Sequence, residues 1–423
     1  MKKLALHWQI LIALVLAALV GWWGGETAGI FGVTFISMYD FVGRLFLNGL
    51  QMLIVPLVAA SIITGMASIG ASGRLGGVGG KTLVFYVVTT LFAVLAGLAL
   101  VNFTQPGIGA DGEPVREELA LEISRAQVSE NIRAGSASDV VDVFVRMVPE
   151  NILHAATSNN GILAVIFFSL LFGFFMTRVE GRPGEVLQDF WQGVFEVMMH
   201  MTHWVMRFAP IGVFALVAEV VAQTGFSAVR PLVIFALTVV AALLVQSLVI
   251  LPLLLRFVGG VNPWKMYRET APALLTAFST ASSNAALPSN MECLEENVGV
   301  SKRITNFVLP LGATVNQHGS ALYECVAAIF LAQAYGIEMS FATQFTVVTL
   351  ALITSMGVAG VPAASLVAIT LILSVIGVPL EAIGVLFVFD RILDMMRTAL
   401  NVFGDGAGAV VVARLEGETG FKI

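Results

Sequence analysis

Residues 279–288 have the sequence STASSNAALP, a run of small polar residues ending in proline inside an apolar segment of about 266–299. A second apolar segment, about 340–378, is interrupted in the same way by SMGVAGVP at residues 355–362. Both segments are too apolar for surface loops, yet the serine, glycine and proline residues at their centres interrupt a helix. We therefore expect each segment to be a broken element, a hairpin that enters and leaves on one side.

The composition places these hairpins in a membrane. Of the 423 residues, 57% are hydrophobic and 12% are charged, whereas about 25% of a soluble domain is charged. Apolar stretches long enough to cross ~30 Å of hydrocarbon recur along the whole chain. The net charge of −6 gives no basic surface for nucleic acid, so that class of partner is excluded.

Eight apolar blocks, separated by short turns rich in glycine, proline or charge, predict eight transmembrane helices. The blocks lie near 8–24, 43–70, 82–103, 140–177, 186–222, 229–258, 304–335 and 380–413. The basic start resembles a signal peptide but lacks a small-x-small cleavage site, so we expect a retained first span. Alternate loops are basic, which predicts a cytoplasmic N-terminus. Cys293 and Cys325 are expected to be free packing residues.

Each broken segment is followed by a helix rich in polar groups. Interrupted segments at matching positions of two halves indicate an inverted-repeat transporter with a site near the membrane midplane. Non-helical backbone at that depth survives only where it is buried in protein or lines a water-filled cavity. The sequence therefore predicts an all-α polytopic membrane protein with eight spans and two re-entrant hairpins.

The last helix, VLFVFDRILDMMRTALNVFGDGAGAVVVA (385–413), carries a stripe of polar side chains. At ~100° per residue the stripe covers roughly 80° of the helix surface. Its members are Asp390, Asp394, Arg397, Asn401 and Asp405. A structural Asp394–Arg397 pair is one explanation, but three acids exceed what one arginine neutralises. A bound cation is the other explanation. Arg397 has a planar fork suited to a carboxylate, and Asp394 suits an ammonium group.

The preceding helix contains PLGATVNQHGSALYE at residues 310–324, a polar run that interrupts an apolar span. An unwound stretch exposes carbonyl oxygens, which hard cations such as sodium bind together with carboxylate and amide oxygens. The candidate shell comprises the Gly312 carbonyl, Asn316, Asn401 and Asp405. A helix kink satisfied by its own side chains is the alternative. Glu324, an isolated carboxylate, is either a proton carrier or a fixed, neutral, hydrogen-bonded group.

Four motifs in this order and spacing resemble the dicarboxylate/amino acid:cation symporter family, which includes excitatory amino-acid transporters and archaeal aspartate transporters. They are the serine-rich hairpin ending in Leu287-Pro288, the stretch Asn316–Tyr323, the Gly-Val-Pro hairpin, and Asp394-x-x-Arg397-Thr398-x-x-Asn401-x-x-Gly404-Asp405. The resemblance covers nearly the whole chain and is strongest from about 266 to 412.

The resemblance implies a homotrimer of elevator-type protomers in the plasma (inner) membrane, with both termini cytoplasmic. Spans 1, 2, 4 and 5 would form a scaffold of residues 1–75 and 109–225. The remaining spans and both hairpins would form a mobile transport domain of residues 76–108 and 226–423. No protein cofactor is implied; the coupling ions would be protons, sodium or both.

The resemblance also implies roles for individual residues. Arg397 would bind the side-chain carboxylate of the substrate and Asp394 its amino group. The rest of the substrate site would comprise Ser282, Ser283, Ser320, Val361, Thr398 and Asn401. One sodium site would comprise the Gly312 carbonyl, Asn316, Asn401 and Asp405, and a second Thr314 with the carbonyls of Ser355, Met356 and Val358. Tyr86, Thr89 and Thr90, with Asn316, match much of a third.

The sequence departs from the family at this third site. The usual Asn-Met-Asp-Gly-Thr motif reads Asn316-Gln317-His318-Gly319-Ser320, so a histidine replaces an aspartate and a glutamine replaces a methionine. Imidazolium does not hold sodium, and histidine titrates near neutral pH. Either a proton has replaced sodium here, with His318 or Glu324 carrying it, or His318 only donates a hydrogen bond and the third ion is absent.

The sequence favours a secondary symporter for glutamate or aspartate, coupled to protons and/or sodium. Arg397 favours acidic substrates, and Asp394 favours an amino acid over a plain dicarboxylate. A C4-dicarboxylate symporter and a channel-like or receptor-like solute-binding protein are the alternatives. We expect no enzyme, because no Ser/His/Asp set, metal-binding cluster or phosphate loop occurs at workable spacing.

Overall fold

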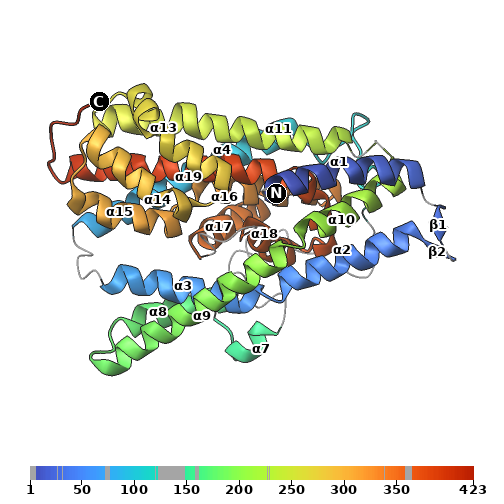
Figure 1. Ribbon diagram of the computed structural model, residues 1–423, viewed down its shortest axis with the longest axis horizontal. Helices are drawn as coiled ribbons and strands as arrows, with labels where there is room; N and C mark the ends of the chain where they lie inside the picture. The colour runs from blue at the N-terminus through green and yellow to red at the C-terminus, as the bar shows by residue number, and fades with distance from the viewer. Residues whose placement is uncertain are drawn as a thin grey trace, which may run out of the picture.

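The computed structural model describes residues 6–25, 27–30, 32–71, 77–119, 121, 148–157, 162–225, 227, 229–337, 339–357 and 364–423. Nearly all regular structure in these residues is helical (Figure 1). The one sheet among them is a short antiparallel ribbon of β1 (Gly29–Ile30) and β2 (Val33–Thr34). The all-α prediction is therefore confirmed for the described part of the chain.

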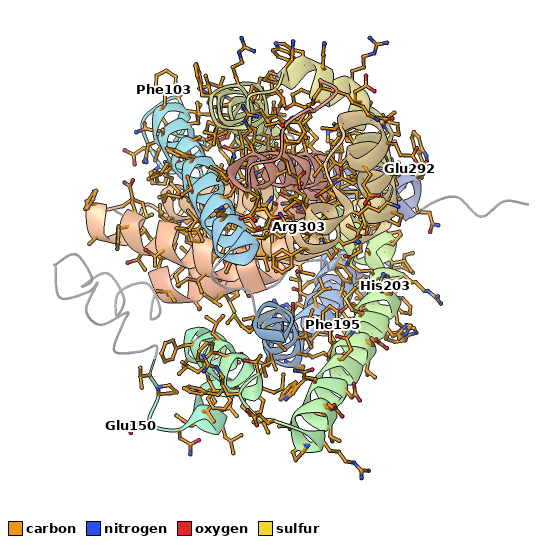
Figure 2. The ribbon with its side chains drawn as sticks, turned by 90° about the vertical axis from the view of Figure 1, so that its left-hand side faces the viewer. Phe103, Glu150, Phe195, His203, Glu292 and Arg303 are labelled. Atoms are coloured by element: carbon orange, nitrogen blue, oxygen red, sulfur yellow. The ribbon has the colours of Figure 1, made fainter. Side chains whose placement is uncertain are left out.

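A first group of helices comes from the N-terminal half of the chain. It comprises α1 (Leu6–Gly24), α2 (Phe35–Gln51), α3 (Ile54–Ala71), α7 (Ile152–Ala156), α8 (Ile162–Met176), α9 (Arg182–Met206) and α10 (Ala209–Thr224). Within it, α10 packs against α1 and α2, and α3 packs against α8 and α9. In Figure 2, α9, with Phe195 and His203, lies away from Phe103 at the end of α4 (Val78–Thr104).

The second group begins with α4 (Val78–Thr104) and then takes almost everything after α10. It comprises α11 (Val229–Val245), η2 (Gln246–Ile250), α12 (Leu251–Leu254), η3 (Leu255–Gly259), α13 (Pro263–Thr280), α14 (Ser283–Glu292), η4 (Cys293–Val298), α15 (Lys302–Val315), α16 (His318–Ala334), α17 (Phe341–Gly357), α18 (Ala364–Ile376), η5 (Leu380–Leu386) and α19 (Phe387–Leu415). Helix α16 lies at its centre, packed against α4, α11, α17, α18 and α19.

Several helices of the described residues are long and apolar enough to cross a membrane, judged by length and composition. They are the run Phe35–Ala67, helix α4 and the run Val229–Gly259. Helices α9 and α10 together form a fourth candidate, bent by 53° at a break of a few residues. The chain is thus a multi-pass helical protein, while the number of eight spans stays a prediction. Both cysteines are free and buried, as expected.

Two of the interruptions predicted from sequence are present. Helix α13 ends at Ala281, which has a left-handed φ of 50°, and Ser282 then caps α14 by accepting a hydrogen bond from the Ala285 N–H (3.3 Å). Helix α15 gives way to α16 at Asn316 and Gln317, neither of which has helical backbone angles. The second hairpin pairs α17 with α18, and its central residues 358–363 lie outside the described part of the chain.

The last residues of the chain fasten one end of the second group. Glu416 forms ion pairs with Lys81 of α4 (2.7 Å) and Arg303 of α15 (3.3 Å). The hydrogen bond from the Lys81 ammonium group holds the pKa of the Glu416 carboxyl below its usual value. Glu418 accepts a hydrogen bond from the Ser301 hydroxyl, and the Lys422 N–H donates to the Val298 carbonyl (2.9 Å). Residues 335 positions apart are joined in this way.

Close approach of α10 to α2 depends on Gly212. A methyl group at this position would lie 2.2 Å from the ring of Phe46, so we expect Gly212→Ala to lower the free energy of unfolding by about 1–3 kcal/mol. Gly193 of α9 is the matched control, because a methyl group there meets nothing within 4 Å and alanine is the better helix former. The midpoint of thermal aggregation of purified protein tests this. Equal midpoints for the two variants would contradict it.

Candidate functional site

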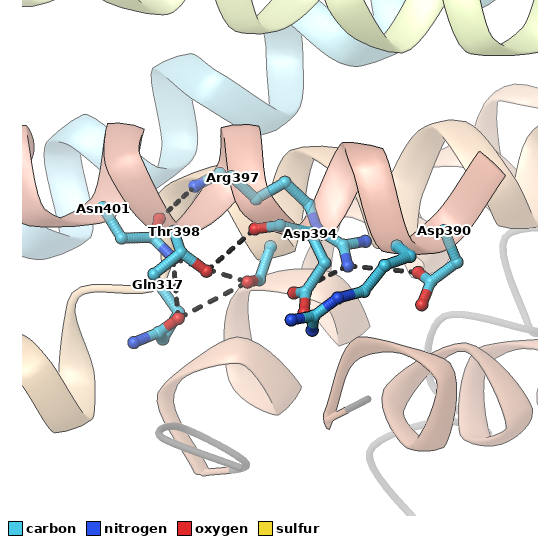
Figure 3. Close-up of polar contacts among 9 residues, drawn as sticks. Gln317, Asp390, Asp394, Arg397, Thr398 and Asn401 are labelled. Atoms are coloured by element: carbon cyan, nitrogen blue, oxygen red, sulfur yellow. Dashed lines mark hydrogen bonds and ion pairs between the residues drawn. The ribbon is translucent and has the colours of Figure 1, made fainter. Parts of the chain in front are cut away.

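The polar stripe of α19 faces the interior of the second group of helices, with Asp394 half-buried and its other members buried (Figure 3). Helix α19 packs against α13, α15, α16 and α4, so polar side chains placed along it point at protein instead of solvent. Arg397, Asn401 and Asp405 are 0%, 2% and 2% exposed. Buried charged and polar side chains need hydrogen-bond or ion-pair partners. The partners of these three residues define two clusters.

The first cluster surrounds Arg397. Its Nη2 atom donates to Asp390 Oδ1 (3.1 Å) and to Asp394 Oδ1 (3.0 Å). The guanidinium carbon lies 3.8 Å from the ring centroid of Tyr323 on α16, which stabilises the cation from its face. The ion pair that the sequence left as an alternative is therefore present and includes Asp390. Arg397 Nε and Nη1 are buried and have no hydrogen-bond partner among the described residues.

Asp394 contacts a second arginine. Its Oδ2 atom lies 3.6 Å from Arg391 Nη1, while its Oδ1 atom holds Arg397. The Thr398 hydroxyl donates to the backbone carbonyl of Asp394 (2.8 Å), within the same helix. Asp390, Arg391, Asp394 and Arg397 therefore form a neutral group of two acids and two bases on two turns of α19.

Asn401 links α19 to the break between α15 and α16. Its Oδ1 atom accepts a hydrogen bond from the Gly319 N–H (2.8 Å), and its Nδ2 atom donates to Gln317 Oε1 (2.7 Å). Ser320 lies at the edge of this contact, 3.5 Å from Asn401 Nδ2. The predicted substrate residues Asn401 and Ser320 are thus brought together, one turn from Thr398.

The predicted substrate residues on the hairpins are only partly described. The Ser282 hydroxyl oxygen caps α14. Ser283 is buried at the start of this helix, and the helix packs against α19. Val361 of the second hairpin lies outside the described residues.

The second cluster surrounds Asp405. Its Oδ1 atom accepts a hydrogen bond from Asn316 Nδ2 (2.9 Å), and Asn316 Oδ1 is buried without a hydrogen-bond partner in the described part of the chain. A methyl group added at Gly312 would lie 2.5 Å from Asp405 Oδ1 and 2.6 Å from the Tyr86 hydroxyl. A carboxylate oxygen and a phenol oxygen thus approach the same point, and oxygen ligands suit a hard cation. The Gly312 carbonyl accepts the Asn316 N–H (2.9 Å), so this predicted ligand has a backbone partner.

The residues of the predicted third cation site mostly bind other groups. The Tyr86 hydroxyl donates to the Val308 carbonyl (2.8 Å), and the Thr89 hydroxyl donates to the Phe85 carbonyl of its own helix (2.9 Å). Thr90 is buried beside them. His318 is fully buried, and neither ring nitrogen has a hydrogen-bond partner among the described residues. The two alternatives for His318, proton carrier or hydrogen-bond donor, both stay predictions.

The residues of the predicted second cation site are only partly described, and this site stays a prediction. The Thr314 hydroxyl donates to the Leu311 carbonyl (2.9 Å), and the Ser355 hydroxyl donates to the Leu352 carbonyl (3.1 Å), each within its own helix. Met356 lies in the last turn of α17, and Val358 lies outside the described residues.

Glu324 faces the second hairpin. Its carboxyl group is 1% exposed, and Oε2 lies 2.8 Å from the Thr354 hydroxyl on α17. The same hydroxyl lies 2.9 Å from the Leu350 carbonyl of its own helix. A hydroxyl has one proton, so a protonated Glu324 donates to Thr354 and a charged Glu324 competes with Leu350 for it.

The sequence also matches a family of known transport proteins. The model of the sodium:dicarboxylate symporter family matches residues 6–415. The chain belongs to this family. Among its relatives, the proton/glutamate-aspartate symporter of Escherichia coli (strain K12) is 37% identical over 414 residues, covering 98% of this chain and 93% of that protein.

Two further members of the family also match. The proton/sodium-glutamate symport protein of Geobacillus stearothermophilus is 36% identical, covering 99% of this chain and 96% of that protein. Excitatory amino acid transporter 3 of Mus musculus is 33% identical, covering 89% of this chain and 79% of that protein. The resemblance inferred from four motifs is confirmed over the whole chain.

Sequence reasoning missed three residues of the site. Arg391 lies seven positions before Thr398, which is two turns away on nearly the same face of α19. This helical spacing could have identified Arg391 as a site residue from the sequence. The contacts of Thr354 with Glu324 and of Tyr323 with Arg397 join different helices. No local spacing in the sequence predicts such contacts.

His318 and Gly404 fit together closely, which yields a test of the second cluster. A methyl group at Gly404 would lie 2.0 Å from His318 Nε2, so Gly404→Ala should cost about 1–3 kcal/mol of stability. At Gly406 the nearest atom is the flexible end of Met266, 3.1 Å away, so Gly406→Ala should be tolerated. Thermal midpoints of purified variants measure this, and Gly404→Ala/His318→Ala should recover most of the loss. A Gly404→Ala protein as stable as Gly406→Ala would refute the packing.

Proposed function

We propose that this chain is a secondary active symporter for glutamate or aspartate in the inner membrane, coupled to protons and/or sodium. The observation that carries the proposal is Arg397, a fully buried guanidinium group with two nitrogens that have no hydrogen-bond partner among the described residues. Its unpaired N–H groups can donate hydrogen bonds to a substrate carboxylate. The curated relatives, named for glutamate and aspartate, support the same substrate class.

In this proposal the substrate lies along α19. Its side-chain carboxylate binds Arg397, and its ammonium group binds Asp394. The main-chain carboxylate binds the polar groups at the next turn and at the hairpin tips: Ser282, Ser283, Ser320, Val361, Thr398 and Asn401. The contact of Asn401 with Ser320 and the packing of α14 against α19 support this placement.

We propose sodium at the second cluster and a proton nearby. Asp405, Asn316, Asn401 and the Gly312 carbonyl would form the sodium site, because a buried carboxylate whose hydrogen-bond partner among the described residues is an amide needs a counterion. A second site would comprise Thr314, Ser355, Met356 and Val358. At the third site of Tyr86, Thr89 and Thr90, the proton would replace sodium, carried by His318 or Glu324. The printed names of the relatives include both proton and sodium.

The helix packing supports an elevator with eight spans, two hairpins and inverted repeats. Helices of residues 1–75 and 109–225 pack mainly with each other and would form the scaffold. Helices of 76–108 and 226–423 also pack mainly with each other and would form the moving unit, in which α4 joins helices much later in the chain. We place the protein in a homotrimer, surrounded by lipid, with both termini in the cytoplasm.

A C4-dicarboxylate symporter of the same fold is the second candidate. It is favoured by one observation, that Asp394 already holds an arginine at each oxygen and so is not a free acceptor for ammonium. A channel-like or receptor-like protein is distinguished by counterflow, since only a carrier concentrates labelled solute inside vesicles against a gradient.

The substrate assignment is tested with proteoliposomes. Arg397→Ala should reduce uptake of labelled glutamate and aspartate at least about 100-fold. Removing one partner of a buried, hydrogen-bonded charge pair loses about 3–5 kcal/mol of stabilising free energy. Arg230→Ala, at an exposed arginine of α11, is the control and should transport like the parent. Unchanged uptake by a folded Arg397→Ala protein would remove the basis of the assignment.

The coupling ion is tested with imposed gradients in the same vesicles. An inward proton gradient should accelerate uptake by the parent several-fold, and Glu324→Gln should abolish that acceleration, because a glutamine carries no proton. His318→Asp should increase the dependence on sodium, since it restores a carboxylate to the third site. Uptake that requires sodium and ignores the pH gradient, in parent and His318→Asp alike, would exclude proton coupling.

A further inference from the structure

One carboxylate of the substrate cluster is shared by two arginines of the same helix. Asp394 Oδ1 lies 3.0 Å from Arg397 Nη2, and Asp394 Oδ2 lies 3.6 Å from Arg391 Nη1. Arg397 is also held by Asp390 and by the face of Tyr323, whereas the ion pair with Asp394 is the one that the described structure gives for Arg391. An ammonium group approaching Asp394 therefore meets a carboxylate that is already neutralised.

The two arginines differ in how firmly they are held. The Arg397 side chain is 1% exposed and its contact with Asp394 has hydrogen-bond length. The Arg391 side chain is 13% exposed, its contact is longer than a hydrogen bond, and its Nε atom is buried without a hydrogen-bond partner in the described residues. Arg391 is thus the partner that an incoming ammonium group displaces.

We propose that Arg391 determines the choice between acidic amino acids and plain dicarboxylates by neutralising Asp394 whenever the substrate has no ammonium group. This inference rests on the proposed function, since it assumes that a substrate carboxylate binds Arg397. Arg391 acts through Asp394 and is a specificity-determining residue, three positions before Asp394 on the same side of α19.

The charges of the two substrate classes explain the expected selectivity. A dicarboxylate brings two negative charges beside Asp394, and without Arg391 the half-buried Asp394 would repel the second carboxylate. An amino acid brings its own cation for Asp394, so Arg391 only competes with it. Removing Arg391 should therefore weaken the binding of dicarboxylates and strengthen the binding of amino acids.

The test measures the Kd values of L-aspartate and succinate for the full-length protein in lipid nanodiscs, by titration calorimetry in sodium buffer. In Arg391→Gln the ratio of the succinate Kd to the aspartate Kd should rise at least about tenfold, which corresponds to about 1.4 kcal/mol. Arg391→Lys is the matched control, and its ratio should stay within about threefold of the parent because the charge remains.

A double-mutant cycle separates a role through Asp394 from a direct contact with substrate. In an Asp394→Asn background, Arg391→Gln should leave the ratio unchanged, because there is no charge left to neutralise. An equal rise in that background, a tenfold rise in Arg391→Lys, or an unchanged ratio in Arg391→Gln would each overturn the proposal.

Two further measurements keep the test decisive. If Arg391→Gln does not elute as folded protein, Asp394→Asn alone is used. This variant should raise the Kd of aspartate at least about tenfold more than the Kd of succinate. An equal rise of both Kd values would overturn the proposal. A parent that binds neither compound refutes the proposed function itself, whereas a parent that binds aspartate with a ratio insensitive to Arg391 refutes only this inference.

Discussion

Compensation of the Arg397 charge is the constraint on which the rest of the structure depends. A guanidinium group cannot shed its proton, so a fully buried arginine needs opposite charge in every state of the protein. Asp390 and Asp394 supply that charge from the same helix, and Tyr323 supplies the face of its ring from α16. Helix α19 lies at the interior, with α16 beside it and with α13 and α14 of the first hairpin packed against it.

The second buried charge, Asp405, is joined to the first through Asn401. About 12 Å of helix separates Arg397 from Asp405, at 1.5 Å per residue. Asn401 lies halfway and binds Gly319 and Gln317, the residues at the break that also places Asn316 beside Asp405. The break therefore contacts both clusters. In the proposed symporter, it would be the physical link between the ion and the solute.

Periodicity and chemistry in the sequence predicted much of this arrangement. The interruption at Ala281, the break at Asn316 and Gln317, and the buried stripe of α19 follow from residue types and helical spacing, and the structure has all three. Partner choice was less predictable. The sequence shows that Asp390 and Asp394 flank Arg397, but only the fold decides that both bind one of its nitrogens. The pairing of Glu324 with Thr354 depends on how α17 packs on α16, which no local pattern encodes.

The placement of α4 has a consequence for biogenesis. This helix leaves the ribosome early, yet its neighbours α11, α16 and α19 and its ionic partner Glu416 are all made later, the last of them 335 residues on. Its buried polar face, with Thr82, Thr89 and Thr90, has no permanent neighbour until the chain is nearly complete. Translation reaches α10 long before it reaches α19, so the first group of helices can pack while α4 is still held in a provisional position. Assembly of the second group can therefore be complete only after α19 and Glu416 have been synthesised.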